Sequence, residues 1–246
     1  DEDVVESYRA SCDPFTGELA EFLESSCLLL RLGEAAFMHG ALPLTQPHLE
    51  AADGSLWDDM TFAMPWLERG VTARDVGVET IDDWNAALND FCRRNVEGFR
   101  TQESDGIWAR FGGYNLQPKD TQPFGPLMQY GTGRTPDRVA NPTIVYSSWG
   151  TNVKDEPRLF LKHDRKYIQH VCEFFQRTGV RLVCCGHQPA GEMPIHIRVD
   201  TGERPCWVLC CDTSYSGDTI WLDENRRNLG RGNARSGRGS VAVSEV

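Results

Sequence analysis

Long hydrophobic runs are absent from this sequence of 246 residues. No apolar stretch approaches the roughly 20 residues that a transmembrane helix requires, which excludes such a helix. The first residues also lack a basic segment followed by an apolar one, so no secretory signal is visible. The chain begins at Asp1 without Met and ends in the strand-like residues 240–246, so we expect both ends to be cut. We expect a cytoplasmic protein that does not bind membranes.

Basic residues are scarce relative to acidic ones. The sequence has 25 Lys and Arg residues against 36 Asp and Glu residues, which gives a formal net charge of −11. Nucleic-acid-binding domains usually carry a basic surface that neutralises the phosphate backbone. The charge therefore argues against a general nucleic-acid-binding protein. It also makes phosphate binding unfavourable unless a local cation overrides the field of the whole protein.

Cysteine is abundant, but the usual cysteine motifs are missing. None of the nine Cys residues forms a C-x-x-C pair, and no ligand spacing typical of a zinc site is present. Cys184–Cys185 and Cys210–Cys211 are adjacent pairs within apolar runs. Because neighbouring strand residues point to opposite faces, a disulfide within either pair is disfavoured. We expect buried, reduced thiols instead.

Hydrophobic periodicity predicts a mixture of helices and strands. Apolar residues recur at helical spacing in residues 16–27, 81–100 and 167–178. Short apolar runs predict strands at residues 27–32, 35–40, 142–149, 181–186, 195–199, 207–214 and 240–246. We therefore expect an α/β protein in which mixed β-sheets are flanked by helices. The economical interpretation is one domain over residues 1–246, with an irregular and helical insertion at about 45–140.

Three of the apolar runs end in short polar segments. The first is followed by His39, the second by His187, and the third by Asp212 and Tyr215. In layered α/β proteins, ligands bind beyond the strand ends, where loops converge on a rigid sheet. Neutral imidazole is a good ligand for zinc, iron or manganese, and each His lies beside a Gly that leaves room for a ligand. The residues alone leave two interpretations open. The two histidines are either a pair of metal ligands or core residues whose ring nitrogens form hydrogen bonds within the protein.

The same strand ends carry short motifs that resemble those of one known family. The run F-M-H-G-A-L resembles the motif F-x-H-G-G-L, and G-H-Q-P resembles the G-H-T-P form of a final histidine motif. The run C-D-T-S-Y-S-G-D occupies the place of a loop that carries a tyrosine over the active site, and V-Y-S-S-W that of a strand ending in a tryptophan motif. Their order resembles that of calcineurin-like metallophosphoesterases, nearest the phosphoprotein-phosphatase branch. The likeness covers most of the chain outside about 45–140.

The resemblance implies a fold and a metal centre. The family fold is a four-layer α/β/β/α sandwich, of which this chain would form an incomplete part. Family members hold two divalent metal ions, here Mn, Fe or Zn, which activate water for attack on a phosphomonoester, a phosphoprotein or a small nucleotide. By resemblance, His39 and His187 bind the same ion, and Pro189 replaces a histidine of other branches. The catalytic residues would be Tyr215 and Asp212. Tyr215 would donate a hydrogen bond to a phosphate oxygen or to the bound water. Asp212 would either accept a hydrogen bond next to the metal ligands or stabilise its own turn through its side chain.

The remaining metal ligands of the family are missing from these residues. The sequence has no D-x-H, no G-D-x-x-D-R-G and no G-N-H-E motif, so it supplies only two of the about six ligands that a two-metal centre needs. We expect the others in a missing N-terminal segment of the same protein, with a phosphorylated substrate as the partner. The alternative is a non-catalytic interaction or scaffold subunit that keeps the fold without a complete metal centre. A thiol-redox protein built on the Cys pairs is a third alternative.

Overall fold

The structure is a computed structural model of the chain. It describes residues 2–13, 15–43, 62–64, 71–101, 127, 130, 131, 143–147, 149, 165–187 and 194–212. Tyr215, the predicted strand at 240–246 and much of the predicted insertion at about 45–140 lie outside the described residues. The division of the chain into domains stays a prediction.

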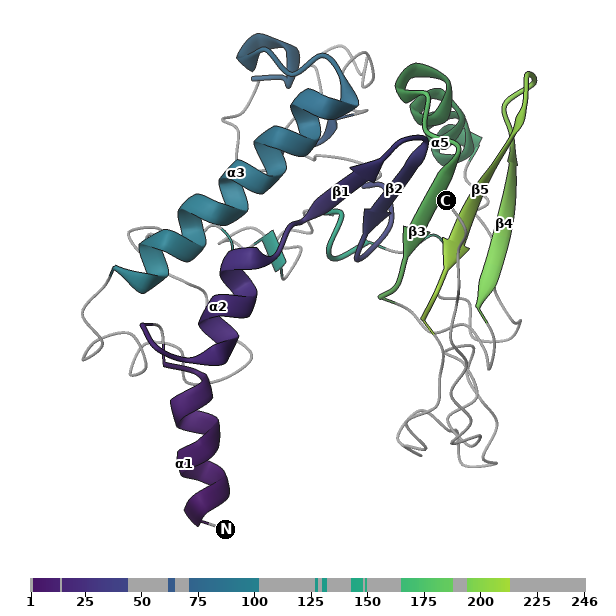
Figure 1. The fold of residues 1–246 in the computed structure, drawn as a ribbon. Coiled ribbons are helices and arrows are strands. Elements are labelled where there is room, and N and C mark those ends of the chain that lie inside the picture. Colours follow the sequence, from purple (N-terminus) through teal and green to yellow (C-terminus); the bar gives the residue numbers. More distant parts are fainter. Residues whose placement is uncertain are drawn as a thin grey trace.

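A mixed sheet of five strands is the framework of the described residues (Figure 1). In chain order its strands are β1 (Leu29–Leu32), β2 (Ala35–Met38), β3 (Leu182–Cys185), β4 (Ile195–Asp200) and β5 (Pro205–Cys210). Across the sheet their order is β1-β2-β3-β5-β4. The α/β class and the mixed sheet predicted from the sequence are confirmed.

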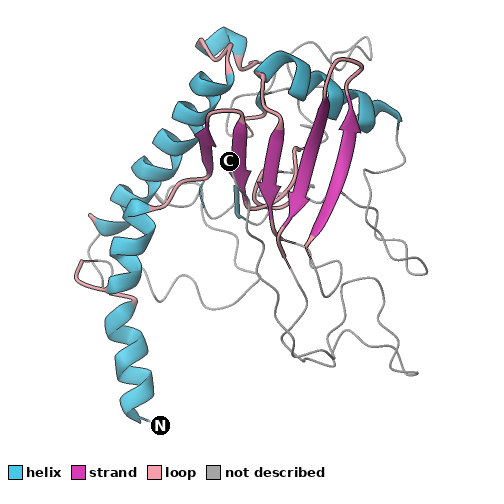
Figure 2. Ribbon diagram, turned by 45° about the vertical axis from the view of Figure 1, so that its right-hand side comes forward, coloured by secondary structure: helices cyan, strands magenta, loops and turns pink. Residues whose placement is uncertain are grey.

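Two antiparallel hairpins border a parallel centre. Strands β1 and β2 pair through a short turn in which Gly33 adopts a φ of +59°, and this hairpin is confirmed as predicted. Strands β4 and β5 form the second hairpin. Between the hairpins, β2 pairs parallel with β3, and β3 pairs parallel with β5. Because parallel strands run in one direction, the carboxyl ends of β2, β3 and β5 lie at the same edge of the sheet (Figure 2).

Two helices cover one face of this sheet. The helical elements are α1 (Glu2–Ser11), α2 (Glu18–Ser25), the 3-10 helix η3 (Arg74–Val76), α3 (Ile81–Arg100) and α5 (Arg165–Thr178). The rings of Trp84 on α3 and Phe174 on α5 lie 6.3 Å apart. Both belong to one buried cluster with Val183 of β3 and Val208 of β5, which joins the two helices to the sheet. No helix in the described ranges is long and apolar enough to cross a bilayer.

The opposite face of the sheet exposes apolar side chains. Leu30 is 42% exposed, Leu32 is 49% exposed and Trp207 is 36% exposed. The strand register places Leu30 beside Phe37, and Leu182 beside Trp207, so these residues share that face. Helices α3 and α5 lie on the other side of the sheet (Figure 2).

The predicted helices agree with the structure except near residue 16. Helix α3 spans the predicted residues and begins with a capping box between Thr80 and Asp83. The helix predicted at residues 16–27 is shorter, Glu18–Ser25, and its N-cap is Gly17. The reason is that the Thr16 backbone N–H donates to the carboxylate of Asp13 at 2.8 Å, which holds Thr16 in the preceding turn.

The prediction of a strand at residues 142–149 is wrong for the residues that the structure describes. Residues 143–147 and 149 form bends and irregular backbone. The Thr143 hydroxyl accepts the backbone N–H groups of Val145 at 3.3 Å and Tyr146 at 3.0 Å. This local side-chain turn competes with strand pairing, and it overrides the β-propensity of the sequence.

Asn89 on α3 ties this helix to the start of β1. Its amide oxygen accepts the N–H groups of Leu28 at 2.9 Å and Leu29 at 3.3 Å, and its amide nitrogen donates to the Leu29 carbonyl at 2.7 Å. Asn89→Ala leaves these groups without their partner, so we expect a loss of about 1–3 kcal/mol in the free energy of unfolding, measured with urea. Asp90→Ala, at an exposed position of the same helix, should lose about 1 kcal/mol or less. Equal losses in the two variants would contradict the assigned role.

Candidate functional site

The carboxyl ends of β2 and β3 bring two histidines together. His39 directly follows β2, and His187 follows Gly186 at the end of β3. Nε2 of His39 and Nδ1 of His187 are 3.3 Å apart, and the ring centroids are 5.2 Å apart with an interplanar angle of 71°. His39 is exposed and His187 is half-buried. The predicted convergence of the two imidazoles at one sheet edge is confirmed, and their role as metal ligands stays a prediction.

The backbone holds His187 in an unusual conformation. Its φ is +75°, the one positive φ at a non-glycine residue in the described ranges. Such a conformation costs on the order of 1–3 kcal/mol and persists only where the surroundings determine it. The Gly186 N–H donates to the His39 carbonyl at 2.8 Å, so the two strand ends are joined through the main chain as well as through the rings. Strain of this kind is concentrated at functional sites.

Asp212 lies at the same sheet edge, two residues after β5. Its Cβ is 3.8 Å from the position that a Cβ on Gly186 would take, which places Asp212 beside the histidine pair. The Cys211 N–H donates to the Cys185 carbonyl at 2.7 Å and continues the pairing of the two strands up to this point. The structure therefore brings together three of the four candidate site residues.

Two opposing effects act on the pKa of His187. Burial lowers it, and the neighbouring His39 lowers it further, whereas the Asp212 carboxylate raises it. The net effect is a pKa below the ordinary value for histidine. The neutral form of the imidazole is therefore favoured at neutral pH, and it is the form that binds metal ions.

Tyr146 packs on His187, a contact that the sequence pattern does not predict. The ring centroids of Tyr146 and His187 are 5.0 Å apart with an interplanar angle of 62°. Tyr146 is 47% exposed, so part of its ring faces solvent next to the histidine pair. The apolar pattern of residues 142–149 predicts a strand, and a strand gives no reason to place this ring at the end of β3. The one available signal was the Thr143 hydroxyl, which can form a side-chain turn.

Gly40 allows the segment that carries Tyr146 to approach the end of β2. A Cβ at Gly40 would lie 2.8–2.9 Å from the carbonyl oxygens of Ser147, Ile144 and Val145. The Gly40 N–H donates to the Ile144 carbonyl at 2.5 Å. From the sequence, this glycine is expected to leave room for a ligand. In the structure it makes room for main chain instead, because three carbonyl groups occupy the space of a side chain.

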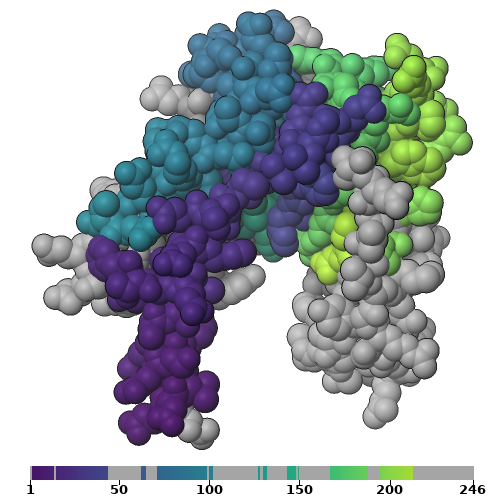
Figure 3. All heavy atoms as spheres, in the orientation of Figure 1, coloured from purple at the N-terminus to yellow at the C-terminus, as the bar shows by residue number. Residues whose placement is uncertain are grey.

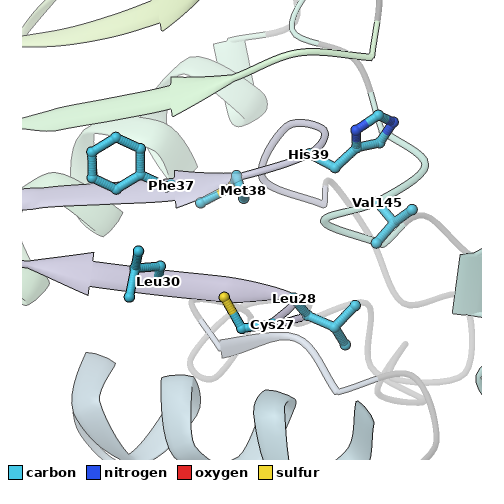
Figure 4. Close-up of a pocket in the computed structure, with 7 residues that line it drawn as sticks. All are labelled: Cys27, Leu28, Leu30, Phe37, Met38, His39 and Val145. Atoms are coloured by element: carbon cyan, nitrogen blue, oxygen red, sulfur yellow. The ribbon is translucent and has the colours of Figure 1, made fainter. Parts of the chain in front are cut away.

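A cavity of about 340 Å³ opens beside His39 (Figure 4). It is lined by Cys27, Leu28, Leu30, Phe37, Met38, His39 and Val145. Apart from His39, these side chains are apolar, and the cavity lies over the β1–β2 hairpin. Such a lining suits an uncharged part of a ligand better than a phosphate group.

The described residues offer a limited set of metal ligands. Tyr215 lies outside them, so its role stays a prediction. Within the described ranges, no group of three or more His, Cys, Asp or Glu residues is arranged to hold a metal ion. The donor set at this edge therefore consists of two imidazole nitrogens, with the Asp212 carboxylate nearby.

Comparison of the chain with protein-family models, curated proteins and solved structures finds no match. The resemblance to calcineurin-like metallophosphoesterases therefore depends on the short motifs and their order. The geometry at the strand ends is an independent observation, because it follows from the pairing of the strands.

The close approach at Gly40 predicts a specific intolerance to larger residues. Gly40→Ala places a methyl group against three carbonyl oxygens, so we expect a loss of about 1–3 kcal/mol in the free energy of unfolding, measured with urea. Gly131→Ala is the matched control, because a Cβ at Gly131 would have no neighbour within 4 Å. Because Gly131 is an exposed helical residue, this change should leave stability unchanged or raise it by up to about 1 kcal/mol. If both variants unfold at the same urea concentration, the segment at 143–147 does not pack against β2 as described.

Proposed function

We propose that this chain is the C-terminal part of a metal-dependent phosphoesterase that hydrolyses phosphomonoesters. The observation that carries this proposal is the 3.3 Å separation of His39 Nε2 and His187 Nδ1 at the carboxyl ends of β2 and β3. The motifs that contain these histidines resemble the two histidine motifs in the second half of calcineurin-like metallophosphoesterases. The substrate is a phosphoprotein or a small phosphorylated nucleotide.

The two imidazoles have the separation expected for ligands of one metal ion. Two nitrogens that each bind zinc at about 2.0–2.1 Å, with a tetrahedral angle between them, lie roughly 3.3–3.4 Å apart. The observed 3.3 Å between the ring nitrogens agrees with this value. The lowered pKa of His187 supports the same role, because a metal ligand must be unprotonated. These residues therefore suit a divalent ion of manganese, iron or zinc.

The residues of this chain would hold and orient parts of the centre. The two metal ions of the proposed enzyme would supply an activated water and neutralise the phosphate oxygens. Within the chain, His39 and His187 would bind one ion, Asp212 would accept a hydrogen bond beside them, and Tyr215 would donate one to the phosphate or the bound water. Local positive charge from the ions would also offset the net charge of −11, which by itself repels phosphate.

The exposed apolar face of the sheet supports the four-layer sandwich as the complete fold. Helices α3 and α5 cover one face, whereas Leu30, Leu32 and Trp207 are exposed on the other. Rows of apolar side chains on a sheet normally pack against a second layer. In the proposed sandwich, a second sheet from an N-terminal segment covers this face, and the remaining metal ligands come from that segment.

The proposal predicts loss of turnover when both histidines are removed. In the complete protein that contains this chain, Mn²⁺ should activate hydrolysis of p-nitrophenyl phosphate. The double variant His39→Ala/His187→Ala removes the ligands of one ion, so we expect kcat/KM to fall by about 100-fold or more. His196→Ala is the matched control, because His196 is exposed and lies on the exposed apolar face of the sheet. Its ring stacks on Trp207, with 5.4 Å between the ring centroids.

Two outcomes would contradict the proposal. Unchanged turnover in the double variant would show that the ligand roles are wrong. A complete protein that binds no Mn²⁺ or Zn²⁺ in calorimetric titrations would instead favour the scaffold subunit, which keeps the fold without the chemistry.

The contact between Tyr146 and His187 predicts a smaller effect on metal affinity. Tyr146→Ala removes the ring that restrains His187, so the affinity for Zn²⁺ should fall by about 2- to 10-fold, the range expected for one aromatic contact. Tyr146→Phe keeps the ring and should bind as the unmodified chain does. Calorimetric titration with Zn²⁺ measures both variants. An equal loss in Tyr146→Phe and Tyr146→Ala would show that the hydroxyl, and not the ring, is what matters.

A further inference from the structure

Two cysteine sulfurs meet between the central strands of the sheet. Cys185 of β3 and Cys210 of β5 are register partners in the parallel pair, and their Sγ atoms are 3.3 Å apart. Neighbouring strands lie about 4.8 Å apart. This spacing falls within the range of about 4.4–6.8 Å between Cα atoms that a disulfide requires. The pair differs from the adjacent pairs of the sequence, whose side chains point to opposite faces.

The two thiols lie at the boundary between the core and the site. Cys185 is 5% exposed and belongs to the buried cluster beneath the helices, and Cys210 is partly exposed and packs against that cluster. The indole N–H of Trp149 donates to the Cys185 sulfur at 3.0 Å. A small oxidant can therefore reach Cys210 first, whereas Cys185 is the buried thiol that would complete the disulfide.

We propose that Cys185 and Cys210 are a redox-active pair that hydrogen peroxide converts to a disulfide. The Cys210 sulfur attacks one oxygen of the peroxide, which breaks the O–O bond, gives a sulfenic acid and releases one water molecule. The Cys185 sulfur then attacks the sulfenic sulfur, forms the S–S bond and releases the second water. Two thiols and one peroxide thus yield one disulfide and two waters, and a dithiol reductant reverses the step.

The disulfide would act directly on the sheet edge that carries the histidine pair. Cys185 lies two residues before His187, and Cys210 lies two residues before Asp212. Bond formation shortens the distance between the sulfurs from 3.3 Å to about 2.05 Å, so it would fix the ends of β3 and β5 to each other covalently. The modification itself does not depend on the proposed phosphoesterase function.

Peptide mapping tests the pair. The chain is treated with hydrogen peroxide, free thiols are blocked with N-ethylmaleimide, and trypsin then gives the peptides 182–198 and 199–226. We expect these peptides to be joined, with the loss of two hydrogen atoms, and to separate after treatment with dithiothreitol. The link should be lost in Cys185→Ser and in Cys210→Ser. It should persist in the double variant Cys184→Ser/Cys211→Ser, which keeps both proposed partners.

A link that survives in either Cys185→Ser or Cys210→Ser, or that disappears in Cys184→Ser/Cys211→Ser, would overturn the proposal. So would the absence of any link in the unmodified chain. Circular dichroism of each variant checks that it folds.

Tryptophan fluorescence gives a second readout, because a disulfide beside the Trp149 indole should quench its emission reversibly. This change should be lost in Trp149→Phe, and a change that persists there would contradict the contact between Trp149 and the thiol pair.

Discussion

Hydrogen bonds between the parallel strands β2, β3 and β5 bring together three segments that are far apart in the sequence. Residues 39, 187 and 212 each follow one of these strands, so the pairing that buries Val183 and Val208 also sets the distances at the sheet edge. The main-chain bond from Gly186 to the His39 carbonyl continues this pairing beyond the strands themselves. The candidate site is therefore as rigid as the sheet to which it is attached.

This arrangement places two closely spaced imidazole rings at the end of a rigid framework. The strained backbone of His187 and the ring of Tyr146 both restrict the orientation of the imidazole. Under the proposed function, side chains held in this way would lose little conformational entropy on binding a metal ion. The thiols of Cys185 and Cys210 lie at the same strand ends, so the proposed disulfide would act on the framework that holds the histidines.

The sequence predicted the elements whose apolar pattern is strong and whose turns are short. The β1–β2 hairpin, β3 and α3 belong to this group, and the convergence of His39 and His187 followed from placing both at strand ends. Residues 143–147 could not be predicted, because one hydroxyl of Thr143 outweighs the β-propensity of the whole segment. The contact between Cys185 and Cys210 could not be predicted either, since periodicity gives the face of a strand residue but not its partner in the next strand.

The central claim is that His39 and His187 share one metal ion, and anomalous X-ray diffraction from crystals grown with Zn²⁺ tests it most directly. The account predicts a zinc peak within about 2.0–2.1 Å of both His39 Nε2 and His187 Nδ1. A zinc peak bound to only one of the two rings, or no peak at the carboxyl ends of β2 and β3, would contradict it.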